Sequence, residues 1–310
     1  MGKKLVFGHK NPDTDALSAA VAMAYYLERI GEEAEAVALG KANDESKFAF
    51  DYFKVSLPRI VSSVADEVEE VVLVDHNEPI QSVDDLDQVT VIQVVDHHRI
   101  FGFNTGQPLY YRAEPIGSTS SVLYKMFQEK DIDIPQAIAG LMLSAIISDT
   151  LLLKSPTCTK EDIDIANELA KIAEVNLNEY GLELLKAGTN IASQSEDQIL
   201  NGDAKNFEMD DQKIRVGQVN IIGFDEILDR KVALLAEMEK AVAQDDLSLF
   251  LFVATDVLDS NSIGLVAGNK ASLAEKAFKQ SLKEQQIDLP GVVSRKKQII
   301  PPLTEAFTEE

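Results

Sequence analysis

Three short apolar runs, each leading directly into a histidine, are the feature that most limits how this chain can fold. The run 91–95 is mostly β-branched and ends in Asp96-His97-His98. Such a run predicts a strand buried on both faces, as strands of a parallel sheet are. Two similar runs end at His9 and at Asp75-His76, so predicted strands carry all four histidines. Because open parallel sheets bind ligands beyond the carboxyl ends of their strands, we expect a site at that edge.

Strands and helices alternate through the first two-thirds of the chain, which favours an α/β domain with a mostly parallel sheet flanked by helices. A small, polar stretch at 189–195 predicts a linker between a larger domain, 1–188, and a smaller α/β domain, 196–310. In the first domain we expect strands at 5–9, 36–39, 70–75, 91–95 and 108–113, and helices at 16–30, 44–53, 118–129, 138–152 and 159–173. In the second we expect strands at 213–222, 247–257 and 263–267, and helices at 226–243 and 271–283.

The composition excludes some classes of function. A formal charge of −23 on 310 residues argues against a broad nucleic-acid-binding surface, which needs clustered lysine and arginine. The single cysteine, Cys158, allows no internal disulfide and fits a reducing cytoplasm. The longest apolar segment, 137–153, contains Ser144, Ser148 and Asp149, which favours a buried core helix over a membrane span. We therefore expect a cytoplasmic protein with no nucleic-acid or membrane partner.

Taken singly, the polar residues near these strand ends have ordinary explanations. The segment Asn11-Pro12-Asp13-Thr14-Asp15 is good turn sequence and suits a helix N-terminus. Asp75, or the paired histidines, can equally be structural. Asp149 is harder to explain, because it interrupts the predicted buried helix and an unpaired buried carboxylate is unfavourable. A metal ion at that point would remove the conflict.

Taken together, these residues predict a metal centre. Imidazole with carboxylate suits Mn²⁺, Co²⁺ or Zn²⁺ better than Ca²⁺. Six protein ligands are too many for one catalytic metal that keeps open positions, but they suit two metals that share a carboxylate. The six candidates are His9, Asp13, Asp15, Asp75, His97 and Asp149.

With these residues the chain resembles a known family, the family II inorganic pyrophosphatases of the DHH phosphoesterase superfamily. The resemblance runs over the full length and rests on five motifs that occur in order. They are Gly8-His9-Lys10-Asn11-Pro12-Asp13-Thr14-Asp15, Val74-Asp75-His76-Asn77, Asp96-His97-His98, Ser148-Asp149-Thr150 and Ser294-Arg295-Lys296-Lys297-Gln298.

The resemblance implies roles for the candidate ligands. One Mn²⁺ would bind to His9, Asp13 and Asp75, and a second to Asp15, Asp75, His97 and Asp149, with Asp75 as the bridge. Co²⁺ is a possible substitute, and an additional Mg²⁺ would arrive with the substrate. His98 would face the substrate, so His98 and Asp75 are the predicted catalytic residues. Asp96 and His76 would fix the orientation of ligands. A hydroxide held between the two metals would then attack one phosphorus of pyrophosphate.

The second domain supplies positive charge, which a site for a tetra-anionic substrate needs in so acidic a chain. Arg295-Lys296-Lys297 is its longest basic run. Such a run is commonly just a solvated face, but here Arg295 offers a planar fork for phosphate and Lys296 a point charge. Lys205 matches the family's other phosphate-binding lysine by resemblance only. We expect the active site in the cleft between the domains, closed by movement about the linker. The family also implies a homodimer formed through the first domain.

Two alternatives share parts of this pattern. A DHH phosphodiesterase acting on short oligonucleotides or cyclic dinucleotides would share the metal cluster. Such enzymes resemble one another in a glycine-rich segment with a histidine in the second domain, whereas this chain has no histidine after His98 and carries Arg295-Lys296 instead. A regulatory, non-catalytic metal-binding protein would be favoured by loss of Asp75 or His97, and both are present.

Overall fold

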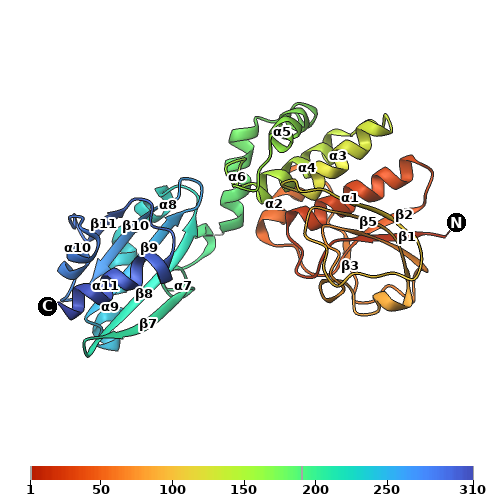
Figure 1. Ribbon diagram of the computed structural model, residues 1–310. Coiled ribbons are helices and arrows are strands. Elements are labelled where there is room, and N and C mark those ends of the chain that lie inside the picture. Colours follow the sequence, from red (N-terminus) through yellow and green to blue (C-terminus); the bar gives the residue numbers. More distant parts are fainter. Residues whose placement is uncertain (1, 190, 310) are drawn as a thin grey trace. The chain divides into compact units, whose positions relative to one another are not determined.

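The computed structural model describes residues 2–189 and 191–309. The chain divides into two compact units, Met1–Gly188 and Thr189–Glu310, each built around its own sheet (Figure 1). The linker assigned to residues 189–195 remains a prediction, and its residue Asn190 lies outside the described residues. The two units are described separately.

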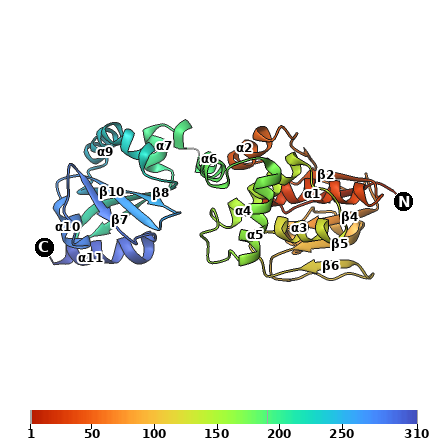
Figure 2. The same ribbon diagram turned by 90° about the horizontal axis from the view of Figure 1, so that it is seen from above.

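The first unit contains a six-stranded parallel sheet, which confirms the predicted sheet type. The strand order is β3-β2-β1-β4-β5-β6, and every neighbouring pair is parallel. Figure 2 shows β6 at one edge. The strands are β1 (Lys4–Phe7), β2 (Ala34–Ala38), β3 (Arg59–Ile60), β4 (Glu70–Val74), β5 (Thr90–Asp96) and β6 (Tyr110–Ala113).

Burial follows position in this sheet. All of β1 and most of β4 are buried, because both strands are central. The prediction that 91–95 is buried on both faces is wrong for its first half: residues 91–93 are partly exposed, and only Val94, Val95 and Asp96 are buried. The strand β5 lies next to the edge strand β6, and its carboxyl end is its buried part.

Helices cover one face of the first sheet and irregular segments the other. The helix α1 (Thr14–Arg29) packs on β1, β2 and β4 and against α3 (Thr119–Glu129) and α4 (Gln136–Asp149). On the opposite face, Leu5, Phe7 and Leu73 form a core cluster with loop residues such as Val64 and Val83. The remaining helices of this unit are α2 (Asp44–Tyr52), α5 (Lys160–Ala173) and α6 (Leu177–Thr189).

The end of α4 differs from the predicted helix over 138–152. The helix ends at Asp149, and Leu151, Leu152 and Leu153 follow with φ of 48°, 54° and 64°. Residues other than glycine are strained in this left-handed region by about 1–2 kcal/mol each. The turn packs against α6. Leu152 Cδ1 lies so close to Gly181 that a Cβ at this glycine would be only 2.3 Å from it. Asp149 is therefore at a helix end and not within a helix.

The second unit contains a five-stranded mixed sheet in the order β11-β10-β9-β8-β7. Only β8 and β9 are parallel, and the other pairs are antiparallel. The strand β9 is buried along its whole length because helices cover both faces. The strands are β7 (Ala204–Met209), β8 (Gln212–Ile221), β9 (Leu249–Asp256), β10 (Asn261–Ala267) and β11 (Gln286–Leu289).

Alternate residues of β9 belong to two separate cores. Phe250 and Phe252 pack with α7 and α9 residues, whereas Leu249 and Leu251 pack with residues of α10 and α11. Figure 2 shows these two helix layers on opposite sides of the sheet. The smaller α/β domain is thus confirmed, although β7, β11, α7 and α11 were not predicted. The helices are α7 (Glu196–Asn201), α8 (Asp225–Asp229), α9 (Lys231–Asp245), α10 (Ser272–Phe278) and α11 (Ile300–Thr308).

None of the helices within the described residues is long and apolar enough to span a lipid bilayer.

Candidate metal centre

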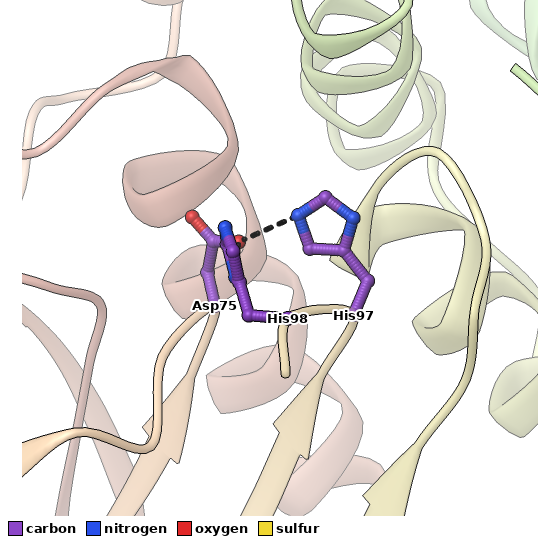
Figure 3. Close-up of side chains that lie close together, drawn as sticks. All are labelled: Asp75, His97 and His98. Atoms are coloured by element: carbon purple, nitrogen blue, oxygen red, sulfur yellow. Dashed lines mark ion pairs between the residues drawn. The ribbon is translucent and has the colours of Figure 1, made fainter. Parts of the chain in front are cut away.

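Three neighbouring strands of the first sheet end in the candidate ligands. His9 follows β1, Asp75 follows β4 directly, and His97 follows β5. These strands are adjacent in the order β1-β4-β5, so their carboxyl ends place the three side chains at one edge. Figure 3 shows Asp75, His97 and His98 at the ends of their strands, with a dashed line from Asp75 to His97.

The first group of side chains with metal-binding geometry is His9, Asp13 and Asp75. His9 Nε2 lies 3.5 Å from Asp13 Oδ2 and 3.4 Å from Asp75 Oδ2. The other ring nitrogen, Nδ1, donates to the Lys10 carbonyl at 2.8 Å, which turns Nε2 toward the carboxylates. Asp13 is also the N-cap of α1, accepting from the Ala16 amide through Oδ1. Its second oxygen therefore stays available to the cluster.

The second group is Asp15, His97 and Asp149. His97 Nδ1 donates to the Ile116 carbonyl at 3.0 Å, so that its Nε2 faces Asp75 Oδ1 at 3.4 Å. Asp15 is fully buried and is fixed by the start of α3. It accepts from the Thr119 amide at 2.6 Å, the Ser120 amide at 3.1 Å and the Ser120 hydroxyl at 2.7 Å.

Asp75 stands between the two groups. Its Oδ2 faces His9 and its Oδ1 faces His97, each at 3.4 Å. The Thr119 hydroxyl donates to Oδ1 at 3.0 Å. The backbone of Asp75 has a φ of 58°, a conformation that aspartate and asparagine adopt more readily than other residues with a Cβ. This turn at the end of β4 sets the carboxylate between the two imidazoles.

His98 is held beside the cluster and remains half-exposed. Its Nδ1 lies 2.9 Å from Asp96 Oδ1 and 3.7 Å from Asp75 Oδ1. The hydrogen bond to Asp96, against the effect of burial, raises the pKa of His98. Asp96 itself is buried and accepts from Asn77 Nδ2 at 2.7 Å. Asp96 thus orients His98, which is also the third member of a group with Asp75 and His97.

His76 has no such orienting contact in the structure. Its Nδ1 pairs with the Val74 carbonyl at 2.9 Å, and its buried Nε2 has no hydrogen-bond partner. Burial lowers the pKa of His76. The hypothesis that His76 orients a metal ligand therefore finds no support in these contacts.

The cluster combines four carboxylates, Asp13, Asp15, Asp75 and Asp149, with two imidazoles, His9 and His97. Burial lowers the pKa of His9, but hydrogen bonds with Asp13 and Asp75 outweigh it and raise the pKa to about 11. Burial likewise lowers the pKa of His97, but the hydrogen bond with Asp75 and the nearby carboxylate charges outweigh burial and raise this pKa to about 9. Burial and then the Asp75 charge raise the pKa of Asp15 to about 6. Burial followed by repulsion from Asp15 and Asp75 raises the pKa of Asp149 well above its ordinary value.

These observations fit a bound divalent metal. Asp149 Oδ2 is buried without a hydrogen-bond partner, and repulsion between carboxylates is what a cation between them removes. Mixed imidazole and carboxylate donors suit Mn²⁺ and similar ions. The structure thus brings together all six residues singled out in the sequence.

Two family models match the chain. The DHH family N-terminal domain matches residues 3–146 and the DHHA2 domain residues 182–306. Proteins of Lactobacillus gasseri and Lactiplantibacillus plantarum, each named "Probable manganese-dependent inorganic pyrophosphatase", are 53% identical over 309 residues and 54% identical over 307, with 99% of each chain covered. The chain belongs to the manganese-dependent, family II inorganic pyrophosphatases. A crystal structure of a Methanococcus jannaschii protein described as a candidate member of this family is 38% identical, with a TM-score of 0.61 over 98% of this chain and 99% of that chain.

In this family II chain, the basic residues singled out in the sequence lie in the second unit. Lys205 is on β7 and Lys296 is in a π-helical turn, Arg295–Ile299, and both are exposed. Arg295 is mostly buried, and its Nη2 lies 2.8 Å from Asp203 Oδ1. Its Nη1 donates to the Asp203 carbonyl. This contact joins the start of β7 to the basic turn, two segments far apart in the sequence.

Sequence reasoning missed Thr119 and Ser120, whose donors fix Asp15 and Asp75. A serine-rich helix start at Ser118-Thr119-Ser120-Ser121 was visible. Nothing local identified the carboxylates that these groups would meet, because Asp15 lies about a third of the chain away.

Proposed function

We propose that this protein hydrolyses inorganic pyrophosphate to two phosphates at a dinuclear Mn²⁺ centre. The observation that carries the proposal is the position of Asp75, whose two oxygens face His9 and His97 from opposite groups of candidate ligands. One carboxylate between two sets of donors is what a shared ligand of two metals requires. The names of the relatives support pyrophosphate as the substrate.

In this proposal the candidate ligands divide into two sets. His9, Asp13 and Asp75 hold one metal, and Asp15, Asp75, His97 and Asp149 hold the other, with Co²⁺ as a possible substitute and a further Mg²⁺ arriving with the substrate. When bound, the metals supply Lewis acidity, which polarises phosphate oxygens and makes water a stronger nucleophile. Thr119, Ser120 and Ile116 orient the candidate ligands by hydrogen bonds to Asp15, Asp75 and His97.

His98 is the side chain of the first unit best placed to bind substrate. It is half-exposed beside Asp75, and Asp96 holds its Nδ1, which leaves Nε2 to donate to a phosphate oxygen. The raised pKa of His98 favours the protonated ring, which donates a stronger hydrogen bond to an anion. Asp96 thus supports catalysis through His98.

The second unit contributes the cations. Lys205, Arg295 and Lys296 would neutralise charge on the phosphate groups, since phosphoryl transfer depends mainly on positioning and electrostatic stabilisation. In this proposal both units contact the same substrate molecule. The Arg295–Asp203 contact supports a common phosphate-binding region, because it brings residues 203–205 next to the basic turn.

The decisive experiment compares two substrates. Apo-protein is supplied with Mn²⁺, and phosphate release from pyrophosphate is measured against hydrolysis of a bis-aryl phosphodiester. We expect strong preference for pyrophosphate, and an Asp75→Asn variant serves as the blank for contaminating activity. Preference for the diester would instead support a DHH phosphodiesterase.

We also propose a homodimer formed through the first unit, in the cytoplasm. The edge strand β6 supports a dimer, because its Tyr110 is 47% exposed and an edge strand can pair with another chain. Light scattering coupled to size exclusion tests the assembly. A mass near 34.0 kDa at working concentration would contradict it.

A further inference from the structure

One carboxylate outside the predicted ligands joins two parts of the metal centre. Glu45, the second residue of α2, is half-buried. Its Oε1 accepts from the Thr14 hydroxyl at 2.6 Å and from the Ser148 hydroxyl at 2.5 Å. Thr14 stands between Asp13 and Asp15, and Ser148 immediately precedes Asp149. A single oxygen atom therefore connects the start of α1 to the end of α4.

This connection matters most for Asp149. Asp13 is fixed as a helix cap, and Asp15 is fixed by three donors from α3. Asp149 Oδ2, by contrast, is buried without a hydrogen-bond partner. Its place is set by the last turn of α4, and the strained left-handed residues follow at once. The Ser148 hydroxyl ties that turn to Glu45, and Glu45 in turn accepts from Thr14, which stands next to Asp15.

Glu45 is itself confined from several sides. Asn43 caps α2 by accepting from the Ser46 amide at 2.7 Å, and the Ser46 hydroxyl lies 3.2 Å from that of Thr14. On another side Gly188 of α6 packs against the side chain, since a Cβ at Gly188 would lie 3.0 Å from Glu45 Oε2 and 3.1 Å from Glu45 Cβ. The carboxylate thus has little freedom to move away from the two hydroxyls.

We propose that Glu45 is a positioning residue that holds Asp149 and Asp15 at the spacing needed by the metal bound to Asp15, His97 and Asp149. The inference rests on the dinuclear centre proposed above and names a residue that acts on one of its two positions. A purely structural role for Glu45 predicts something different, namely lower stability with unchanged affinity for both metals.

The test measures Mn²⁺ binding to metal-free protein by calorimetry, without substrate. In Glu45→Ala we expect one of the two Mn²⁺ ions to bind roughly 10–100-fold more weakly, the usual effect of removing a group that orients metal ligands. Glu45→Gln keeps an acceptor oxygen and is expected to bind both ions within a few-fold of the unchanged protein. Glu35→Ala is the matched control. Glu35 lies on β2 and forms ion pairs with Lys3 and Arg59, so its replacement is expected to change neither affinity.

Activity assays add a second readout. Pyrophosphate hydrolysis by Glu45→Ala should recover as the Mn²⁺ concentration is raised, with little change in KM for pyrophosphate. Unchanged affinity for both ions in a folded Glu45→Ala protein overturns the inference and leaves the proposed function intact. If the unsubstituted protein binds fewer than two Mn²⁺ ions, the proposed function fails and the inference fails with it.

A milder variant covers the case in which Glu45→Ala does not fold. Ser148→Ala removes one donor and leaves Glu45 held by Thr14. We expect the same single Mn²⁺ ion to bind roughly 10-fold more weakly. Equal affinity in Ser148→Ala and the unsubstituted protein would overturn the inference.

Discussion

Arg295 and Asp203 form an ion pair within the second unit, with 2.8 Å between Arg295 Nη2 and Asp203 Oδ1. Arg295 Nη1 also donates to the Asp203 carbonyl, so the guanidinium is already engaged by one residue through both its side chain and its backbone. A phosphate that binds to Arg295 therefore competes with the Asp203 carboxylate, which is 60% exposed.

Replacing Asp203 by asparagine should favour substrate binding. The substitution removes the competing charge, while the backbone carbonyl still holds Arg295 in place. Only the Asp203 side of this pair is exposed, Arg295 being mostly buried, so we take the upper end of the range for exposed pairs, about 1 kcal/mol, and expect KM for pyrophosphate to fall by about fivefold with little change in kcat. Asp197 on α7 accepts a hydrogen bond from Asn201 Nδ2, and Asp197→Asn makes the same charge change and controls for net charge. A rise in KM specific to Asp203→Asn would show that the carboxylate is needed to place Arg295.

Lys296 and Lys297 offer a comparison between adjacent, exposed lysines. If Lys296 binds a phosphate, Lys296→Ala should lower kcat/KM by about 10-fold or more, the usual value of a hydrogen bond to a charged group. Lys297→Ala removes the same charge one residue on and should have a much smaller effect. Steady-state kinetics at fixed ionic strength give both values. Equal losses in the two variants would indicate a diffuse electrostatic effect and no specific contact.

Asp75→Asn should abolish hydrolysis and leave the fold intact. Asparagine tolerates the left-handed backbone at this position, but it loses the charge that lies between His9 and His97. A direct metal ligand should matter at least as much as the groups that orient it, which typically contribute 10–100-fold. We therefore expect activity to fall at least about 100-fold and Mn²⁺ stoichiometry to drop, with an unchanged circular dichroism spectrum. Near-normal turnover would disprove the bridging role.

Removing the metal should destabilise the first unit selectively. Ligand binding at 100 times its dissociation constant stabilises the folded state by about 2.7 kcal/mol per site, and Mn²⁺ also relieves the repulsion among Asp15, Asp75 and Asp149 that raises the Asp149 pKa. Calorimetric melting after chelation should show a lower transition for this unit, restored by Mn²⁺ but much less by Ca²⁺. Identical melting with and without Mn²⁺ would argue against a metal centre here.

The sequence predicted β1, β4 and β5 of the first sheet because strand ends and ligand positions coincide there. Short β-branched runs ending in His9, Asp75 and His97 contain both the strand and the site in a few consecutive residues. The edge strands β3, β7 and β11 were missed because their residues are largely polar or exposed to solvent at least in part. Strands at an edge lack the apolar run by which a buried strand is recognised.

The end of α4 could not be predicted from periodicity. The apolar pattern continues through Leu151, Leu152 and Leu153, and a left-handed turn buries leucines as readily as a helix does. The hydrogen bonds between Thr119 and Asp15 and between Ser148 and Glu45 could not be predicted from the sequence either. Each joins two segments that only the folded chain brings together. The candidate ligands could be named from the sequence, but the residues that orient them could not.

The φ of 58° at Asp75 limits which amino acids can occupy this position. Among residues with a Cβ, asparagine and aspartate adopt that backbone most easily, and of these two only aspartate is anionic. Glycine would suit the backbone but has no side-chain atom that could bind a metal. Glutamate would supply the negative charge, but its backbone would be strained and its side chain would be longer. The local geometry thus leaves a single amino acid that serves both purposes, so natural variation at position 75 would signal a lost centre and not a retuned one.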